Sequence, residues 1–398
     1  MNLKRKKLLI LGAGIHQTPL IEEAKKMGLE VHVCSKTGNY PGISIAHHFH
    51  EVDISDKIKV FELTKKLKID GILTTATDVC LESIGIAVDE LGLIGTGSKN
   101  SKACLDKIIM KKRFLLNKVP TPKYIEINKY EDAIEFFNNI GHDCVLKPTD
   151  SSGSRGVTKI ENISHLEEAY HKALHFSKSG KVIIEEWLVG EELGAQAIVI
   201  EGKLALLTLH SDITTPPPHR VPIGHGCPHP EEAKLLPLAT NITEKAIKAL
   251  GIGTGICNVD YILSNQGLQI IEMTCRMGGT HLPEVCGEYW GFNFYKLAIQ
   301  LSLGEKPIFP KSPLGKINAA HNLILKSEGT LIKLGIMNHE YDWHFYFEEG
   351  ENITLNASNQ AELGYVQVTG SNPSTILNLA SKTANIFRKS TKVSEGLI

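Results

Sequence analysis

The sequence predicts an α/β protein in which a parallel sheet comes first and antiparallel sheets follow. Its length of 398 residues points to two or three domains. Residues 8–95 alternate short apolar runs with amphipathic stretches, which is typical of parallel strands joined by helices. Further along, apolar runs such as 195–200 and 204–209 are separated by a short polar turn, which favours antiparallel hairpins.

The composition is that of an ordinary globular protein, with 42% hydrophobic and 22% charged residues. The net charge of −1 indicates neither a nucleic-acid-binding surface nor a membrane-binding one. The 8 cysteines are scattered singly, without a Cys-x-x-Cys pair, which is typical of a reducing compartment. We therefore expect a cytoplasmic protein.

The first residues combine a basic cluster at 4–7 with an apolar run at 8–11, which resembles the start of a signal peptide. The run is short, breaks at Gly12 and Gly14, and is not followed by a small-residue cleavage site. No apolar run reaches the roughly 20 residues that span a bilayer. A buried first strand is the better interpretation.

The first domain is expected to contain three strand–helix units. The expected strands are 8–11, 30–34 and 71–74, and the expected helices are 19–27, 57–67 and 80–91. Gly12 and Gly14 follow the first strand, as in a dinucleotide-binding turn, but Gln17 occupies the third glycine position. The second strand also ends without an acid to hold a ribose. This pattern favours a tight turn over an NAD site.

Residues 98–117 read as one helix that contains Lys107, with Ser98 or Asn100 as its cap. Pro120 and Pro122 then break the chain and mark a plausible domain boundary.

A lysine and a polar loop follow in the next strand pair. Residues 144–148 form a strand that contains Lys147, residues 149–156 read T-D-S-S-G-S-R-G, and a second strand begins at residue 157. Successive backbone N–H groups and hydroxyls in such a loop can surround phosphate oxygens. The alternative is an ordinary hairpin tip.

Residues 182–188 form an apolar strand that ends in paired acids. Such a strand suits an adenine site, in which main-chain groups contact the base and an acid holds the ribose. The alternative is an ordinary strand, because strands commonly end in acidic residues. Residues 214–230 are rich in proline, so we expect no regular structure there. Five side chains in this loop invite a zinc interpretation, although their spacing fits no standard zinc motif, and a substrate-facing loop is favoured. They are His219, Arg220, His225, Cys227 and His229.

A helix over 231–250 precedes the most informative stretch, two apolar strands at 258–263 and 268–276 joined by Ser-Asn-Gln-Gly. This hairpin places Asp260 opposite Glu272, and Arg276 ends the second strand. Two carboxylates this close repel each other unless a cation lies between them. Mg2+ takes such oxygen ligands together with substrate phosphates. The alternative is a solvated hairpin with ordinary surface acids.

The end of the chain is expected to contain a loop at 278–281, a helix at 297–303, a β-rich stretch over 317–368 and a closing helix over 374–389.

The order and spacing of these signals resemble the ATP-grasp superfamily. The matching positions are Lys107, Lys147, the loop 149–156, Glu185 to Leu188, Glu192, Asp260, Glu272 and Arg276. The resemblance implies an ATP-grasp fold that grips ATP between two antiparallel sheets. It implies a pre-ATP-grasp α/β domain at 1–97, a helix and lid subdomain at 98–188, a catalytic subdomain at 189–312, and a β-rich subdomain with a closing helix at 313–398.

The resemblance also implies a role for each matching residue. Lys107 and Lys147 would contact the α- and β-phosphates, and Ser151, Ser152, Gly153 and Ser154 would close over them. Glu185 and the backbone of Glu186, Trp187 and Leu188 would contact adenine, and Glu192 would hold the ribose. Asp260 and Glu272 would bind Mg2+ or Mn2+, and Arg276 would steady the acyl phosphate. The family usually has Asn two residues after the second acid, where this chain has Thr274.

Within the superfamily, the S-S-G-S-R-G loop and the proline-rich segment resemble L-amino acid (dipeptide) ligases of the bacilysin-synthetase type. The implied function is ATP-dependent ligation of a carboxylate to an amine through an acyl phosphate. A bicarbonate-activating carboxylase and a nucleotide-binding protein without turnover remain alternatives. The implied partners are small-molecule substrates, with a homodimer left open. Position in loops makes Arg220, His225 and His281 candidates for binding the substrate.

Overall fold

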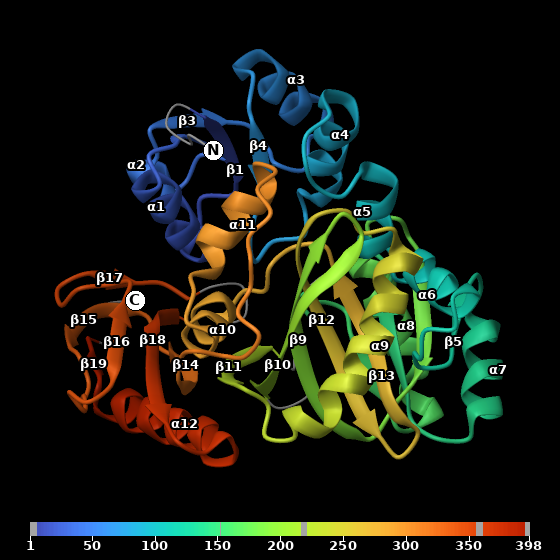
Figure 1. Ribbon diagram of the computed structural model, residues 1–398. Helices are drawn as coiled ribbons and strands as arrows, with labels where there is room; N and C mark the ends of the chain where they lie inside the picture. The colour runs from blue at the N-terminus through green and yellow to red at the C-terminus, as the bar shows by residue number, and fades with distance from the viewer. Residues whose placement is uncertain (1–5, 152, 216–220, 356–360, 395–398) are drawn as a thin grey trace.

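The computed structural model describes residues 6–151, 153–215, 221–355 and 361–394 (Figure 1). The chain begins with a four-stranded parallel sheet of order β3-β2-β1-β4. Its strands are β1 (Lys7–Leu11), β2 (Glu30–Ser35), β3 (His48–Glu51) and β4 (Gly71–Leu73). Its helices are α1 (Thr18–Lys26), α2 (Pro41–Ile45), α3 (Lys57–Leu67) and α4 (Leu81–Leu91).

All the strands and helices expected in this first domain are present. The sequence did not indicate β3 or α2, because His-Phe-His-Glu has no apolar run and α2 is a single short turn. The prediction of one continuous helix over 98–117 is wrong. The chain forms α5 (Ser98–Leu105) and α6 (Lys107–Leu116), separated at Asp106.

The break at Asp106 has a clear physical cause. Its backbone is extended, with φ −98° and ψ 109°, and its carboxylate accepts hydrogen bonds from the N–H groups of Ile108 and Ile109. Asp106 is thus an N-cap, which satisfies donors that the first turn leaves open. Lys107 therefore begins a helix instead of lying inside one.

The next region is a four-stranded antiparallel sheet of order β5-β8-β6-β7. Its elements are β5 (Tyr124–Ile127), α7 (Tyr130–Ile140), β6 (Cys144–Pro148), β7 (Thr158–Ile160), α8 (Leu166–Phe176) and β8 (Val182–Glu186). The polar loop joins β6 to β7, as the sequence predicts. We call this region the lid sheet.

The largest sheet has eight strands in the order β13-β12-β9-β10-β11-β14-β18-β16, all paired antiparallel. The strands are β9 (Gly190–Ile200), β10 (Lys203–Thr214), β11 (Pro222–Cys227), β12 (Gly255–Ser264), β13 (Gly267–Thr274), β14 (Ile317–Leu325), β16 (Asp342–Phe345) and β18 (Ala361–Gly370). Helix α9 (Glu232–Leu250) covers one face beside β12 and β13 (Figure 1).

The expectation that proline excludes regular structure throughout 214–230 is wrong for β11. Pro222 occupies the first position of this strand, where a missing N–H costs least. Residues 216–220 lie outside the described part of the chain, including His219 and Arg220.

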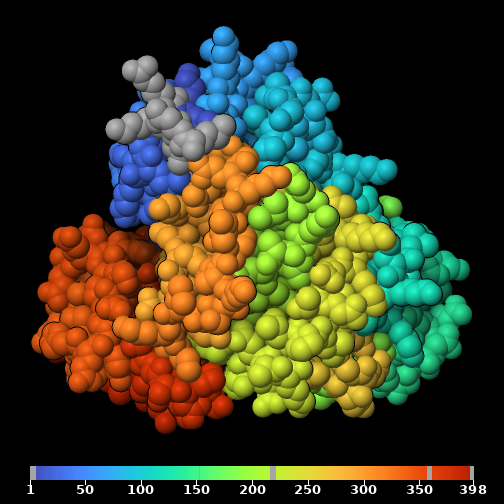
Figure 2. Space-filling view, viewed as in Figure 1, coloured from blue at the N-terminus to red at the C-terminus, as the bar shows by residue number. Residues whose placement is uncertain are grey.

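The remaining elements connect the regions. They are α10 (Leu282–Trp290), α11 (Phe294–Ser302), β15 (Gly329–Lys333), β17 (Asn352–Ile353), α12 (Pro373–Ser390) and β19 (Lys392–Val393). Helix α11 packs on α1 and β4, and α10 packs on β11 and β14. Figure 2 shows this orange segment lying between the blue N-terminal domain and the red C-terminal region. Among the described helices, none has the length and apolar character needed to cross a bilayer.

Candidate active site

The eight-stranded sheet carries a polar row on one face of β9, β12 and β13. Asp260 lies directly opposite Glu272, and Asn258 lies opposite both Thr274 and Gln196. Side chains alternate between faces along a strand, so these five share one face. Neighbouring residues on the other face, such as Val259 and Tyr261, are buried in the core beneath α9.

The two acids predicted to bind metal are therefore brought together. Asp260 is exposed to solvent, yet many protein atoms lie around its carboxyl group and reduce its hydration. This desolvation, together with the charges of Glu272 and Asp212, raises the pKa of Asp260 to about 7. A divalent cation bound here would relieve that repulsion, so the donor set fits Mg2+.

A hydrogen-bond chain orients Asp260, and the sequence did not reveal it. Asn258 Nδ2 donates to Asp260 Oδ1 at 2.8 Å, and Gln196 Nε2 donates to Asn258 Oδ1 at 2.6 Å. Gln196 Oε1 then accepts from the backbone N–H of Gly278 at 2.9 Å. Amide side chains inside strands form no recognisable sequence motif. The hydrogen bonds between Gln196, Asn258 and Asp260 become apparent only from the register of β9 and β12.

Thr274, which takes the place of the usual Asn, lies on the same face as Glu272. It is 5% exposed, and its hydroxyl oxygen is buried without a hydrogen-bond partner among the described residues. Its lone pairs are therefore not committed to a described neighbour.

Lys107 links Glu272 to the polar loop 149–156 between β6 and β7, which we call the lid loop. Its Nζ lies 3.6 Å from Glu272 Oε2 and donates to the carbonyl oxygen of Ser151 at 2.8 Å. Gly153 and Ser154 follow in left-handed conformations, with φ of 67° and 58°. Ser152 lies outside the described residues. Of the predicted loop residues, Ser151 is thus in contact with the lysine through its main chain.

Two further lysines, Lys111 and Lys147, lie on either side of Glu185. Its Oε2 lies 3.1 Å from Lys147 Nζ and 3.2 Å from Lys111 Nζ, and the Glu185 and Lys111 side chains are each 1% exposed. Burial lowers the pKa of Lys111 to about 8 despite the attraction of Glu185. Burial opposes the Glu185 charge, but the two lysines lower its pKa overall. The carboxylate of Glu185 therefore positions Lys147, and sequence reasoning missed Lys111 because it resembled an ordinary helix lysine.

At the strand exit after β8, the backbone N–H groups of Glu186 and Trp187 donate to the carbonyl oxygens of Lys123 and Asp143, both at 2.9 Å. Glu186 Oε1 accepts from the backbone N–H of Lys123 at 2.9 Å, so this carboxylate serves the lid sheet. Lys159 Nζ lies 5.2 Å from the centre of the Trp187 ring, and Leu188 is buried. Glu192 lies on β9 opposite Ile262, beside a cavity of about 550 Å³.

Arg276, just after strand β13 of the eight-stranded sheet, contacts the first domain. Its Nε donates to Asp78 Oδ1 at 2.8 Å, and its Nη2 donates to Asp78 Oδ2 at 3.1 Å. Burial opposes the guanidinium charge, but the carboxylates of Asp78, Asp260 and Glu272 raise the pKa of Arg276 overall. Sequence reasoning missed Asp78. The available signal was an acid in the loop that follows the β4 strand, at the carboxyl edge of a parallel sheet.

A cleft of about 580 Å³ lies between the first domain, α5–α6 and the lid loop. Asp78, Ser151 and Glu272 all line it. Lys107 contacts Ser151 and Glu272 of this lining, and Arg276 contacts Asp78, so groups from separate parts of the sequence meet at or next to the cleft.

The three substrate candidates do not form one group. His225 is buried, and its Nδ1 lies 2.5 Å from Asp212 Oδ1, which also contacts His210 at 2.8 Å. These three side chains are close enough to hold a metal ion. Two other residues of the zinc interpretation lie elsewhere: Cys227 is buried in the core, and His229 contacts Glu191. Arg220 lies outside the described residues.

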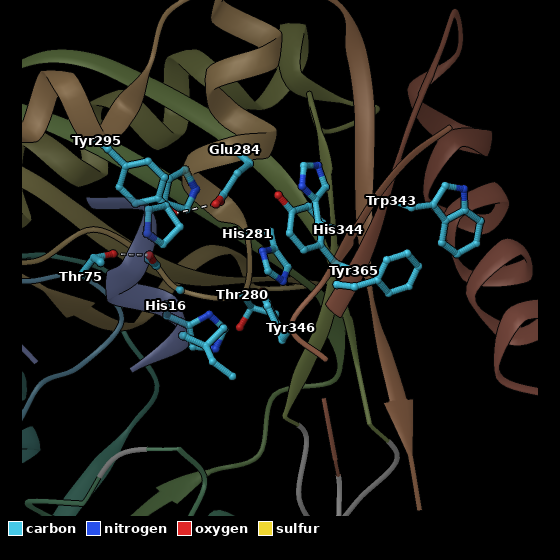
Figure 3. A pocket seen from close by; sticks show the side chains of 16 residues that line it. His16, Thr75, Thr280, His281, Glu284, Tyr295, Trp343, His344, Tyr346 and Tyr365 are labelled. Carbon is cyan, nitrogen blue, oxygen red and sulfur yellow. Dashed lines mark hydrogen bonds between the residues drawn. The ribbon is translucent and has the colours of Figure 1, made fainter. Parts of the chain in front are cut away.

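His281 lies in a separate cavity of about 330 Å³ (Figure 3). The first domain, the loop 278–281, helix α10 and strands β16 and β18 all contribute to it. Its polar and aromatic lining includes His16, Thr75, Glu284, Tyr295, Trp343, His344, Tyr346 and Tyr365. Gly278 also lines it, two residues beyond Arg276, which places this cavity next to the predicted catalytic arginine.

Comparison with known proteins identifies the domain family and the fold. Residues 104–280 match the model of the ATP-grasp domain family. The formate-dependent phosphoribosylglycinamide formyltransferase of Saccharolobus solfataricus is 26% identical over 341 residues, covering 81% of this chain and 82% of that protein.

Two solved structures share the fold over almost the whole chain. Phosphoribosylglycinamide synthetase from Anaerococcus prevotii superposes with a TM-score of 0.80 and 25% identity, covering 98% of this chain and 100% of that one. L-amino acid ligase from Bacillus licheniformis superposes with a TM-score of 0.79 and 19% identity, covering 98% and 99%. The chain therefore has the ATP-grasp fold, with an ATP-grasp domain at residues 104–280, and is an ATP-grasp ligase that uses ATP and Mg2+.

Proposed function

We propose that this ligase joins a carboxylate to an amine through an acyl phosphate, with an amino acid among its substrates. The observation that carries the proposal is that Asp260, Glu272, Lys107 and Arg276 lie near one another, with a separate cavity lined by the residues that follow Arg276. A carboxylate is a poor acyl donor, and phosphorylation by ATP supplies a leaving group. That transfer requires alignment and charge neutralisation more than a protein nucleophile.

Each residue has a defined part in this proposal. Lys107 and Lys147 contact the phosphates, while Ser151, Ser152, Gly153 and Ser154 close over them. The main chain of Glu186, Trp187 and Leu188 contacts adenine, Glu192 holds the ribose, and Glu185 keeps Lys147 in place. Asp260 and Glu272 hold Mg2+, with Thr274 beside them. The bound ion would neutralise phosphate charge, and Arg276 would stabilise the charge that develops on the acyl phosphate.

In the first step, a substrate carboxylate oxygen attacks the γ-phosphorus of ATP, and the bond to the β-phosphate oxygen breaks to release ADP. In the second step, the amine nitrogen attacks the acyl carbon. The C–O bond breaks, phosphate leaves, and the nitrogen loses a proton. Closure of the lid loop would keep water from hydrolysing the intermediate.

A bicarbonate-activating carboxylase is the main alternative. Such an enzyme needs a site for a very small anion, whereas the cavity beside Arg276 is about 330 Å³ and largely aromatic. This size supports an organic substrate. The third possibility, nucleotide binding without turnover, is disfavoured by the pairing of Asp260 with Glu272 across β12 and β13 and by the presence of Arg276 just after β13.

The test is phosphate release from Mg2+-ATP with amino acids supplied singly and in pairs, with bicarbonate, and with formate plus phosphoribosylglycinamide. The proposal expects release that depends on an organic carboxylate together with an amine. Release with bicarbonate alone would identify a carboxylase. Nucleotide binding with no release under any condition would refute the ligase activity.

A further inference from the structure

The cavity shown in Figure 3 is lined by residues that lie close in sequence to the proposed catalytic centre. Thr75 Oγ1 donates to the carbonyl oxygen of Gly278 at 3.2 Å, and both residues line the cavity. Thr75 lies three residues before Asp78, and Gly278 lies two residues after Arg276. Arg276 and Asp78 do not line the cavity themselves, but a substrate end placed at Gly278 or Thr75 lies within three residues of each of them along the chain.

One acid that lines the cavity, Glu284, has a hydrogen-bond partner for only one of its two carboxylate oxygens among the described residues. Glu284 Oε1 accepts from the Tyr295 hydroxyl at 2.8 Å, whereas Oε2 is buried without a hydrogen-bond partner among the described residues. No lysine or arginine occurs among the described residues that line this cavity. Leaving a buried carboxylate oxygen unpaired is costly, so the site is suited to receiving a donor from a ligand.

The histidines of the cavity do not supply the missing positive charge. Burial lowers the pKa of His281 to about 4, and burial also lowers the pKa of His16. Both imidazoles are therefore neutral near pH 7. Glu362 lies next to both histidines: its Oε1 is 3.5 Å from His281 Nε2, and its Oε2 is 3.8 Å from His16 Nε2. It is a second carboxyl group close to the cavity.

Aromatic rings form the rest of the enclosure. Tyr365 stacks between His281 and His344, with ring centres 3.7 and 4.4 Å apart. Tyr295 and Tyr346 also line the space. The faces of aromatic rings attract organic cations, particularly where a carboxylate completes the site. A phosphate group, in contrast, is usually held by arginine, lysine or several backbone donors.

We propose that this cavity binds a substrate that carries an ammonium or similar organic cation and no phosphate, with the cation placed against Glu284. This inference rests on the proposed ligase function. The reacting carboxylate would point toward Gly278 and Arg276. An amino acid carries both an ammonium group and a carboxylate and has no phosphate, so it has the required chemistry, and a phosphoribosyl compound does not.

The experiment combines binding and turnover on matched probe pairs. L-phenylalanine is compared with 3-phenylpropanoate, L-alanine with propanoate, and phosphoribosylglycinamide serves as the phosphorylated probe. Thermal shifts measure binding in the presence of Mg2+-ADP, and phosphate release measures turnover. The variant Glu284→Gln removes the charge but keeps an acceptor for Tyr295. Glu232→Gln is the matched control, because Glu232 also accepts a tyrosine hydroxyl, from Tyr289 at 2.7 Å, but does not line the cavity.

We expect at least one amino acid to bind, its partner without the ammonium group to bind at least 10-fold more weakly, and Glu284→Gln to remove that difference while Glu232→Gln retains it. Turnover with the amino acid should show a KM raised about 10-fold in Glu284→Gln, with the KM for ATP unchanged. Binding of phosphoribosylglycinamide alone, equal binding of the partners with and without the ammonium group, or an unaffected Glu284→Gln variant would overturn the inference. Charge-dependent binding without phosphate release would instead uphold the cavity assignment and refute the ligase proposal.

Discussion

At the scale of single residues, the structure changes how several predicted roles are understood. Glu185 was expected to contact adenine, yet its carboxylate lies between Lys111 and Lys147 and holds them in place. Arg276 was expected beside the phosphates, and it also forms a bidentate pair with Asp78. Neither pairing leaves a local pattern in the sequence, because Glu185 lies 38 residues from Lys147 and Arg276 lies 198 residues from Asp78.

The Arg276 side chain gives the first prediction. Arg276→Ala should lower kcat by about 100-fold or more, because it removes a donor aimed at developing negative charge. The Kd for ATP should change by less than about threefold. Asp78→Asn, which leaves the guanidinium in place, should reduce kcat by a smaller factor. Stopped-flow nucleotide binding and steady-state kinetics measure the two effects, and full activity in Arg276→Ala would refute its role.

Lys147 gives a second prediction. Lys147→Ala should raise the Kd for ATP about 10-fold, since a charge-assisted contact to phosphate is lost. Lys172→Ala, on helix α8 of the same lid region, is the matched control and should bind ATP normally. Isothermal titration with ADP and with ATP measures both variants. Equal affinities in the wild type and Lys147→Ala would contradict the assignment.

The raised pKa of Asp260 gives a third prediction. Because its folded pKa of about 7 lies above that of the unfolded chain, the folded state holds more protons between about pH 4 and 7. The stability that this proton provides is present below about pH 4 and is lost as pH rises through 7. Asp260→Asn should therefore raise Tm more at pH 8 than at pH 5.

Mg2+ competes with the same proton, so the affinity of the wild type for Mg2+ should increase between pH 6 and pH 8. Calorimetry at several pH values measures both quantities. A Tm difference independent of pH would show that Asp260 is already ionised in the folded protein.

At the scale of elements, the helix break at Asp106 shows what propensity reasoning misses. Residues 98–117 contain good helix formers throughout, so a continuous helix was the natural prediction. The sequence did carry an N-cap residue at the break, but helices also tolerate Asp inside them. The hairpin of β12 and β13 was predictable, because its turn and alternating apolar residues are local signals. β11 was not, because pairing with β10 and β14 outweighs its proline and glycine content.

The N-cap gives a prediction at this scale. Asp106→Ala should cost about 1 kcal/mol of unfolding free energy, since two backbone donors lose their acceptor. It should also raise the KM for ATP, because Lys107 is the first residue of the helix that Asp106 caps. Urea denaturation and steady-state kinetics provide the two readouts. Asp106→Asn retains an acceptor and should restore most of both properties.

At the scale of the whole molecule, the site exists only where the first domain, the lid sheet and the eight-stranded sheet meet. The order of these regions was predictable from the alternation of strands and helices and from the family resemblance. The cavity at His281 was not, because it combines Thr75, α10 and β18, which only the packed chain brings together. The continuation of the catalytic sheet into β14, β18 and β16 is likewise a property of tertiary pairing.

The most direct test of the account follows an oxygen atom from substrate to product. A mixture of amino acids labelled with 18O in their carboxyl groups is incubated with the protein and Mg2+-ATP, and the released phosphate is analysed by mass spectrometry. An acyl phosphate intermediate predicts that each phosphate carries one 18O atom. Turnover that releases only unlabelled phosphate would contradict carboxylate activation at the site formed by Asp260, Glu272 and Arg276.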